Sequence, residues 1–104
     1  MIGIACTMSP GAFSGEISFE IESVEGSHTG LASRLYFFKK NKEPVGKEAV
    51  GNNVPGYIVI RTLFEQETGS KNSVLASIPD GEVVRVKKDQ IQVLESAPHV
   101  PVGS

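Results

Sequence analysis

Few side chains in this sequence have the chemistry of a catalytic or metal-binding group. Cys6 is the only cysteine, and the two histidines, His28 and His99, stand far apart, in a predicted turn and near the C-terminal end. No acidic residue stands at a recognisable metal-ligand spacing, so we expect no metal site and no cofactor. A nucleophilic cysteine would need a histidine and an orienting group beside it. We therefore expect Cys6 to pack as a small apolar residue, and an enzyme is the less favoured class.

Two glycines, Gly46 and Gly51, have the spacing found in a phosphate-binding loop. Asn52 and Asn53, however, occupy the positions where that motif requires lysine and then serine or threonine. We therefore expect no nucleotide site of this type.

The charge balance limits the class of partner. The 104 residues include 10 basic and 12 acidic side chains, a net charge of −2, which argues against a dedicated nucleic-acid-binding protein. The average conceals an asymmetry, because residues 1–30 carry four acidic side chains and no lysine or arginine, whereas residues 31–50 carry five basic side chains against two acidic ones. These segments could attract each other across a subunit boundary or a ligand.

The length fits one domain, which we place at residues 1–96, with a flexible tail at residues 97–104. No apolar run is long enough for a transmembrane helix, and the N-terminal residues lack the basic region of a signal peptide. We therefore expect a cytoplasmic protein that does not contact a membrane.

The elements that must position any site are short strands. Alternation is clearest over residues 16–22, where Ile17, Phe19 and Ile21 share one face. This segment and a strand over residues 2–8 make an N-terminal hairpin. Further strands are expected over residues 31–38, 57–64, 73–78, 83–87 and 91–94.

The sequence also predicts the turns and loops that connect these strands. Polar residues 25–30 are expected to turn the chain into the strand over residues 31–38. Residues 39–56, rich in proline, glycine and asparagine, are predicted to form a long loop, a common place for a binding site. Residues 79–82 indicate a tight hairpin turn and residues 88–90 a single 3₁₀ turn, with a helix over residues 88–95 as the alternative.

Residues 73–94, SVLASIPDGEVVRVKKDQIQVL, resemble the end of SH3-like small β-barrels, including Tudor-type and KOW-like domains. These domains commonly end in a strand, a tight hairpin, a strand, a 3₁₀ turn and a short strand. With the strand that begins at Tyr57, the resemblance covers residues 57–94. It implies an all-β fold, a small antiparallel SH3-like barrel to which the N-terminal hairpin is added. The clustered aromatic residues of a Tudor-type cage and the glycine of the KOW signature are missing, so the resemblance implies no ligand.

Two predicted strands, residues 31–38 and 57–64, carry more apolar side chains than one buried face requires. Placing Arg34 outward puts Leu31, Leu35 and Phe37 in the interior, because a guanidinium is costly to bury. The outward side chains then form an apolar patch with basic residues at its rim, which is typical of an interface or a ligand groove. The candidate binding residues are Arg34, Tyr36, Phe38, Tyr57, Val59 and Arg61.

The sequence leaves three alternatives for what covers this patch: the hairpin of residues 2–22, a second copy of the chain, or a peptide or small-molecule ligand. We expect a non-enzymatic binding module that acts as a homo-oligomer through the patch. One alternative is a small enzyme whose active site forms between subunits, with residues 39–56 at its mouth. The other is a weak binder of single-stranded nucleic acid, in which Tyr36 and Phe38 stack on bases beside lysines, and the acidic net charge makes it the least expected.

Overall fold

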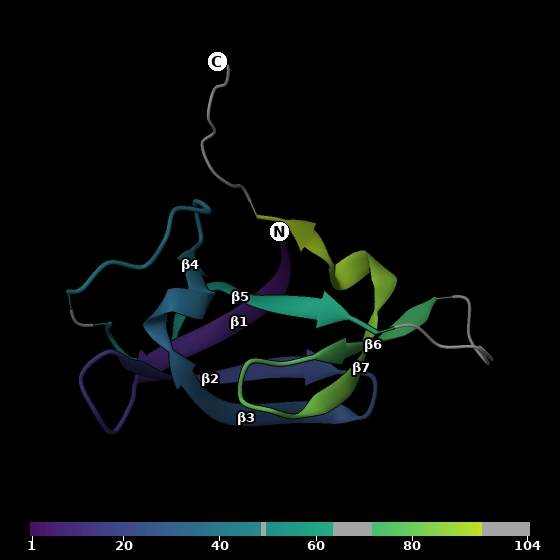
Figure 1. The fold of residues 1–104 in the computed structure, drawn as a ribbon, viewed down its shortest axis with the longest axis horizontal. Helices are drawn as coiled ribbons and strands as arrows, with labels where there is room; N and C mark the ends of the chain where they lie inside the picture. Colours follow the sequence, from purple (N-terminus) through teal and green to yellow (C-terminus); the bar gives the residue numbers. More distant parts are fainter. Residues whose placement is uncertain (49, 64–71, 95–104) are drawn as a thin grey trace, which may run out of the picture.

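The computed structural model describes residues 1–48, 50–63 and 72–94, which form a curled antiparallel sheet (Figure 1). The fold is all-β, as predicted, and its shape is that of a half-barrel. The strands are β1 (Ile2–Pro10), β2 (Glu16–Ser23), β3 (Gly26–Ser33), β4 (Phe37–Lys39), β5 (Val54–Thr62), β6 (Ser73–Ser77), β7 (Val83–Lys87) and β8 (Gln92–Val93). Two 3₁₀ turns, η1 (Arg34–Tyr36) and η2 (Lys88–Gln90), complete the elements. Within these ranges, no helix is long and apolar enough to cross a membrane.

Strand β1 lies in the interior of the sheet and pairs with β2, β5 and β8. The order is β3-β2-β1-β5-β6-β7, while β4 pairs with β5 and β8 pairs with β1. The sheet curls until its ends approach each other, since the Val24 amide after β2 donates to the Arg85 carbonyl of β7 at 2.8 Å. Figure 1 accordingly shows the β6–β7 hairpin lying over β2 and β3.

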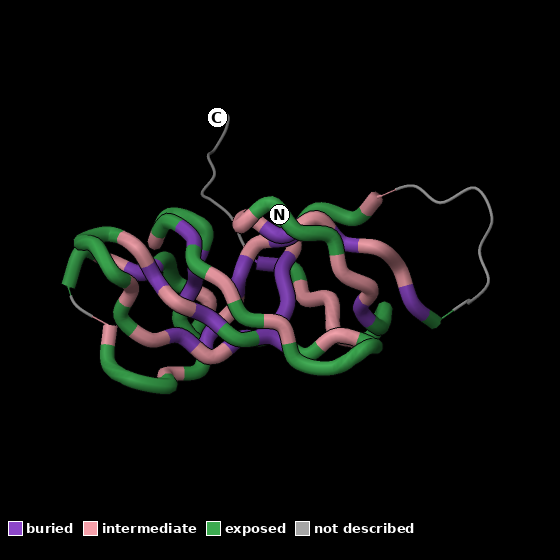
Figure 2. Tube along the Cα trace, turned by 90° about the horizontal axis from the view of Figure 1, so that it is seen from below, coloured by how far each residue is buried: buried purple, intermediate pink, exposed green. Residues whose placement is uncertain are grey.

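The predicted alternation in β2 is confirmed, because Ile17, Phe19 and Ile21 are all buried. Ile4, Cys6 and Met8 of β1 and Ile58 and Ile60 of β5 belong to the same core. In Figure 2 the buried segments run along the middle of the molecule, with exposed segments around them. Burial of each large side chain contributes about 1.5–3 kcal/mol to folding, so this core is the main source of stability.

The prediction of one strand over residues 31–38 is wrong. The turn after β2 lies at residues 24–25, so β3 already occupies the segment that was expected to be a loop. Ser33 ends β3 and caps η1, and its Oγ accepts a hydrogen bond from the Leu35 amide at 3.2 Å. The 3₁₀ turn η1 interrupts the strand, so the inward and outward alternation of side chains in β3 does not carry over into β4.

The inward and outward assignments therefore change. Leu31 and Leu35, predicted to be interior, are 46% and 72% exposed, whereas Phe38, predicted to be outward and accessible, is only 9% exposed. The loop over residues 39–56 is also shorter than predicted. Phe38 forms an isolated bridge with Pro44, and β5 starts at Val54 rather than at Tyr57.

The C-terminal predictions are confirmed where the structure describes the chain. Gly81 has φ +97°, and the Ile78 amide donates to the Glu82 carbonyl at 2.8 Å, which closes the tight turn. The strand over residues 83–87 and the 3₁₀ turn over residues 88–90 form as predicted, and β8 replaces the alternative helix. The predicted tail at residues 97–104 lies outside the described residues.

Candidate functional site

Three of the predicted binding residues lie on one face of the sheet, opposite the core. Phe38 of β4 pairs with Tyr57 of β5, and Tyr57 pairs with Ala5 of β1. Val59, two residues further along β5, pairs with Gly3. The register therefore brings Phe38, Tyr57 and Val59 together, and we call these three residues the outer-face cluster.

Other parts of the same chain cover much of the outer-face cluster. Pro44 bridges to Phe38, and Lys42 Nζ lies 5.7 Å from the centroid of the Tyr57 ring, a cation–π distance. Phe38 is accordingly 9% exposed, and Tyr57 and Val59 are half-buried. Lys42 thus covers the Tyr57 ring, and Pro44 flanks Phe38 at the edge of the sheet.

The segment that follows η2 covers the other side. Leu94 is 0% exposed, and its amide donates to the Met1 carbonyl at 2.9 Å. A Cβ on Gly3 would lie 2.5 Å from Leu94 Cδ1, so the absence of a side chain at Gly3 lets Leu94 pack against β1. The hairpin of residues 2–22 does not cover this face, because β1 joins β5 edge to edge.

The remaining predicted residues lie elsewhere. Arg34 and Tyr36 belong to η1, where Arg34 is half-buried and Tyr36 is 45% exposed. Arg61 is exposed near the end of β5, where it pairs with Ser77. The structure thus does not assemble the six predicted residues into one surface.

A different apolar surface lies at the end of β3. Leu31, Leu35 and Tyr36 are large, exposed and close in sequence. Phe13, 75% exposed, lies in the β1–β2 turn that joins the same end of the sheet, where the Arg34 amide donates to the Gly15 carbonyl at 2.8 Å. Sequence reasoning missed this surface, although Ser33, a residue that favours capping positions, was a signal that the strand stops there.

The edge of β3 carries backbone groups without a sheet partner. Ser23 and Gly26 pair around a two-residue turn, and the register continues without a bulge to Glu16 and Ser33. Closely and widely spaced pairs alternate along such a ladder, so the backbone groups of His28 and Gly30 face β2. The backbone groups of the residues that alternate with them, Ser27, Thr29 and Leu31, face away from β2. Among the described strands, β3 pairs with β2 alone.

Cys6 and His28, the candidate reactive side chains within the described residues, are both packed against other parts of the chain. Burial raises the pKa of the Cys6 thiol to about 12, so the thiol is neutral and unreactive near pH 7. His28 Nε2 lies 2.9 Å from Asp80 Oδ2, and the His28 ring packs at a tilt against Phe19. The described residues also contain no group of three or more metal-ligating side chains.

The chain was compared with protein-family models, curated protein sequences and solved structures, and none of them matches it.

Proposed function

We propose that the protein is a non-catalytic interaction module with an SH3-like barrel fold, and that it self-associates by antiparallel pairing of the β3 edges of two copies. The unpartnered edge of β3 carries this proposal, because a strand edge offers a row of donors and acceptors for another chain. This surface replaces the outer-face cluster as the candidate interface, since the chain itself covers much of that cluster.

The composition of β3 supports the proposal. Its sequence, GSHTGLAS, has no lysine, arginine, aspartate, glutamate or proline, and its register has no bulge. Those are the devices with which proteins usually prevent a strand edge from pairing. At the other end of the sheet, β7 carries Arg85 and Lys87, and the Arg85 carbonyl already accepts a hydrogen bond from Val24.

The free backbone groups of β3 are also complementary to themselves. With a two-fold axis at Thr29, the Thr29 residues of the two copies are opposite each other, and Leu31 is opposite Ser27. Each of these pairs exchanges two hydrogen bonds, as in a regular antiparallel ladder. The exposed side chains of Leu31, Leu35 and Tyr36 supply apolar area beside the new ladder.

Electrostatic repulsion does not oppose this pairing. Glu20 and Glu22 are exposed on β2, next to β3. In the paired sheet the two β2 strands are three strand spacings apart, about 14 Å. This separation exceeds the Debye length of about 8 Å at physiological ionic strength, so the repulsion between the two acidic rows is largely screened.

Amide hydrogen exchange followed residue by residue tests the proposal with an internal control. The amides of Thr29 and Leu31 face the free edge, whereas those of His28 and Gly30 donate to β2 in every state. We expect protection of Thr29 and Leu31 to rise with protein concentration while that of His28 and Gly30 stays high. Rapid exchange of Thr29 and Leu31 at every concentration would contradict the proposal.

A further inference from the structure

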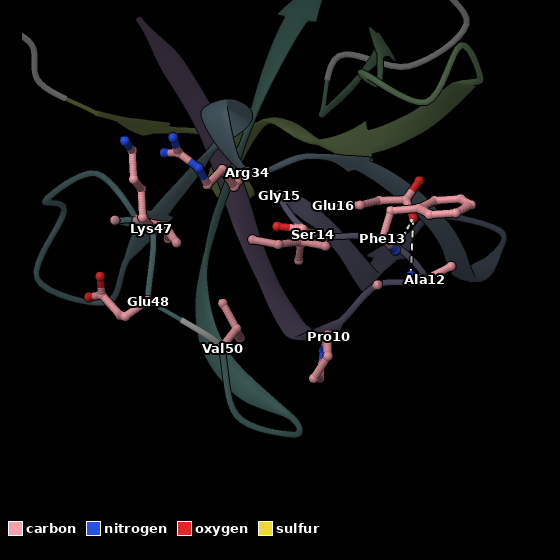
Figure 3. A pocket seen from close by; sticks show the side chains of 14 residues that line it. Pro10, Ala12, Phe13, Ser14, Gly15, Glu16, Arg34, Lys47, Glu48 and Val50 are labelled. Carbon is pink, nitrogen blue, oxygen red and sulfur yellow. Dashed lines mark hydrogen bonds between the residues drawn. The ribbon is translucent and has the colours of Figure 1, made fainter.

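A cavity of about 610 Å³ lies between the β1–β2 turn and a wall made of residues 45–48 and Val50 (Figure 3). One wall is formed by residues 10–17 and the opposite wall by residues 45–48 and Val50, while Arg34 of η1 joins the two. The Arg34 amide holds the turn in place through its hydrogen bond to the Gly15 carbonyl. The cavity is therefore built from three segments that the sheet brings together, and it is separate from the free backbone groups of β3.

Two basic side chains, Arg34 and Lys47, line this cavity. Figure 3 shows the side chains of Arg34 and Lys47 extending to the same side of the cavity. Across residues 1–48, 50–63 and 72–94, neither side chain forms an ion pair. Two of the five basic side chains of residues 31–50 thus lie at this cavity, together with Glu48 from the same segment.

The acidic side chains of the lining are directed elsewhere. Glu16 Oε1 accepts hydrogen bonds from the amides of Ala12 and Phe13 at 3.1 and 3.3 Å. Glu48 folds back on its own loop, because its Oε1 lies 2.5 Å from the position that a Cβ on Gly46 would occupy. Neither carboxylate neutralises Arg34 or Lys47.

The rest of the lining determines which anion fits. Ile17 and Val45 are buried, and Val50 is half-buried, so the cavity has an apolar wall beside the two cations. The turn does not offer the row of free amides that typically binds phosphate, since the Gly11 amide donates to the Glu16 carbonyl and the Glu16 amide to the Phe13 carbonyl. A planar carboxylate, by contrast, needs only the guanidinium fork and a neighbouring ammonium group.

We propose that this cavity binds a small organic carboxylate with a compact apolar body. The carboxylate lies between Arg34 and Lys47, and the apolar body packs against Val45 and Val50. The interaction is charge-assisted, so the affinity depends on both the negative charge and the apolar part of the ligand.

Titration of the full chain with 4-ethylbenzoate, followed by two-dimensional amide NMR, tests this proposal. We expect saturable shifts confined to residues 11–17, 34, 45–48 and 50. Neutral 4-ethylbenzamide, which has the same apolar body, should produce no saturable shift. Binding of 4-ethylphenyl phosphate should be no tighter than that of the carboxylate.

Charge-removing variants test the residues. Because loss of a hydrogen bond to a charged group costs roughly 1.5–3 kcal/mol, Arg34→Gln should weaken 4-ethylbenzoate binding about tenfold or more. Lys47→Gln should weaken it severalfold, and the matched control Arg61→Gln should leave it unchanged. The dispersion of the amide spectrum shows whether each variant is folded.

Four results would overturn the proposal: no saturable shift at ligand concentrations up to about 10 mM, an equal response to the amide, tighter binding of the phosphate, or unchanged affinity in folded Arg34→Gln and Lys47→Gln proteins. Self-association through β3 can succeed or fail independently of these results.

Discussion

The imidazole of His28 and the carboxylate of Asp80 form a hydrogen bond that fastens the β6–β7 turn to β3, with Nε2 and Oδ2 2.9 Å apart. Asp80 Oδ1 also accepts a hydrogen bond from the Glu82 amide at 2.9 Å, so one carboxylate both shapes the turn and anchors it. The side chains of His28 and Asp80 are only 21% and 10% exposed, which shields the contact from water. This pair joins two segments 52 residues apart and helps the sheet to stay curled.

Substitution Asp80→Ala should therefore destabilise the fold. It removes both the hydrogen bond to His28 and the hydrogen bond within the turn, and it leaves a partly buried histidine without its partner. We expect a loss of about 1.5–3 kcal/mol in the free energy of unfolding, measured with urea. The matched control, Glu82→Ala, removes an exposed carboxylate from the same turn and should change stability by no more than about 0.5 kcal/mol. Equal stability of the two variants would show that the His28–Asp80 hydrogen bond has no structural role.

Gly30→Ala should be destabilising at the same place. A Cβ at this position would overlap Asp80 Oδ2 and lie 3.0 Å from Phe19 Cζ. We expect a loss of about 1–3 kcal/mol in the urea unfolding experiment, and a smaller loss in the Asp80→Ala background, where the overlap is gone. The control is Gly51→Ala, whose nearest contact would be an ordinary 3.4 Å. Additive effects of Gly30→Ala and Asp80→Ala would contradict this explanation.

Leu94→Ala should show that the segment after η2 is part of the fold. Leu94 is 0% exposed against Gly3, and truncation of a buried leucine costs about 2–5 kcal/mol. Its neighbour Val93 is 71% exposed, so Val93→Ala should change stability by less than about 0.5 kcal/mol. Thermal or urea unfolding of both variants measures the difference. If Leu94→Ala were as stable as Val93→Ala, the outer-face cluster would not be covered in this way.

Stability should also depend on Cys6 at alkaline pH. Its pKa is raised by burial from 9.0 to about 12, so between these values the unfolded chain loses the thiol proton while the folded chain retains it. The unfolded state then binds fewer protons, and the contribution of Cys6 to stability is lost as pH rises above 9. Unfolding of wild type and Cys6→Ala across this range isolates the effect, because the other titrating groups are common to both. Parallel stability curves would refute it.

Local sequence signals predicted the parts of the fold that depend on local physics. The alternation over residues 16–22 and the glycine of the Pro79–Asp80–Gly81 turn each determine the backbone around them. Residues 31–38 were predicted wrongly because the decisive interaction, the Ser33 side chain accepting from the Leu35 amide, ends a strand that composition alone appeared to continue.

The candidate surfaces depend on long-range pairing, which the sequence did not reveal. The surplus of apolar side chains was a correct observation, but its partial covering by Lys42 and Leu94 depends on contacts between segments that are distant in the sequence. The free edge of β3 became visible only once the strand register was known. Phe38 is only 9% exposed, so Phe38→Asp should unfold the protein, because it would bury a charge.

The most direct test of the central claim is the molar mass of wild type and of Thr29→Pro and Thr29→Lys, measured by sedimentation equilibrium over a concentration series. The Thr29 amide faces the free edge, so proline there removes an edge donor without removing a hydrogen bond to β2. Lysine at the same position is the standard block to edge pairing and needs no change in the backbone. The control is Val83→Lys, at an exposed position of β7.

We expect wild type and Val83→Lys to approach twice the chain mass of 11.1 kDa as concentration rises, and folded Thr29→Pro and Thr29→Lys to remain at the mass of one chain. A wild-type mass of one chain at every concentration, or undiminished association of the folded Thr29 variants, would contradict the account.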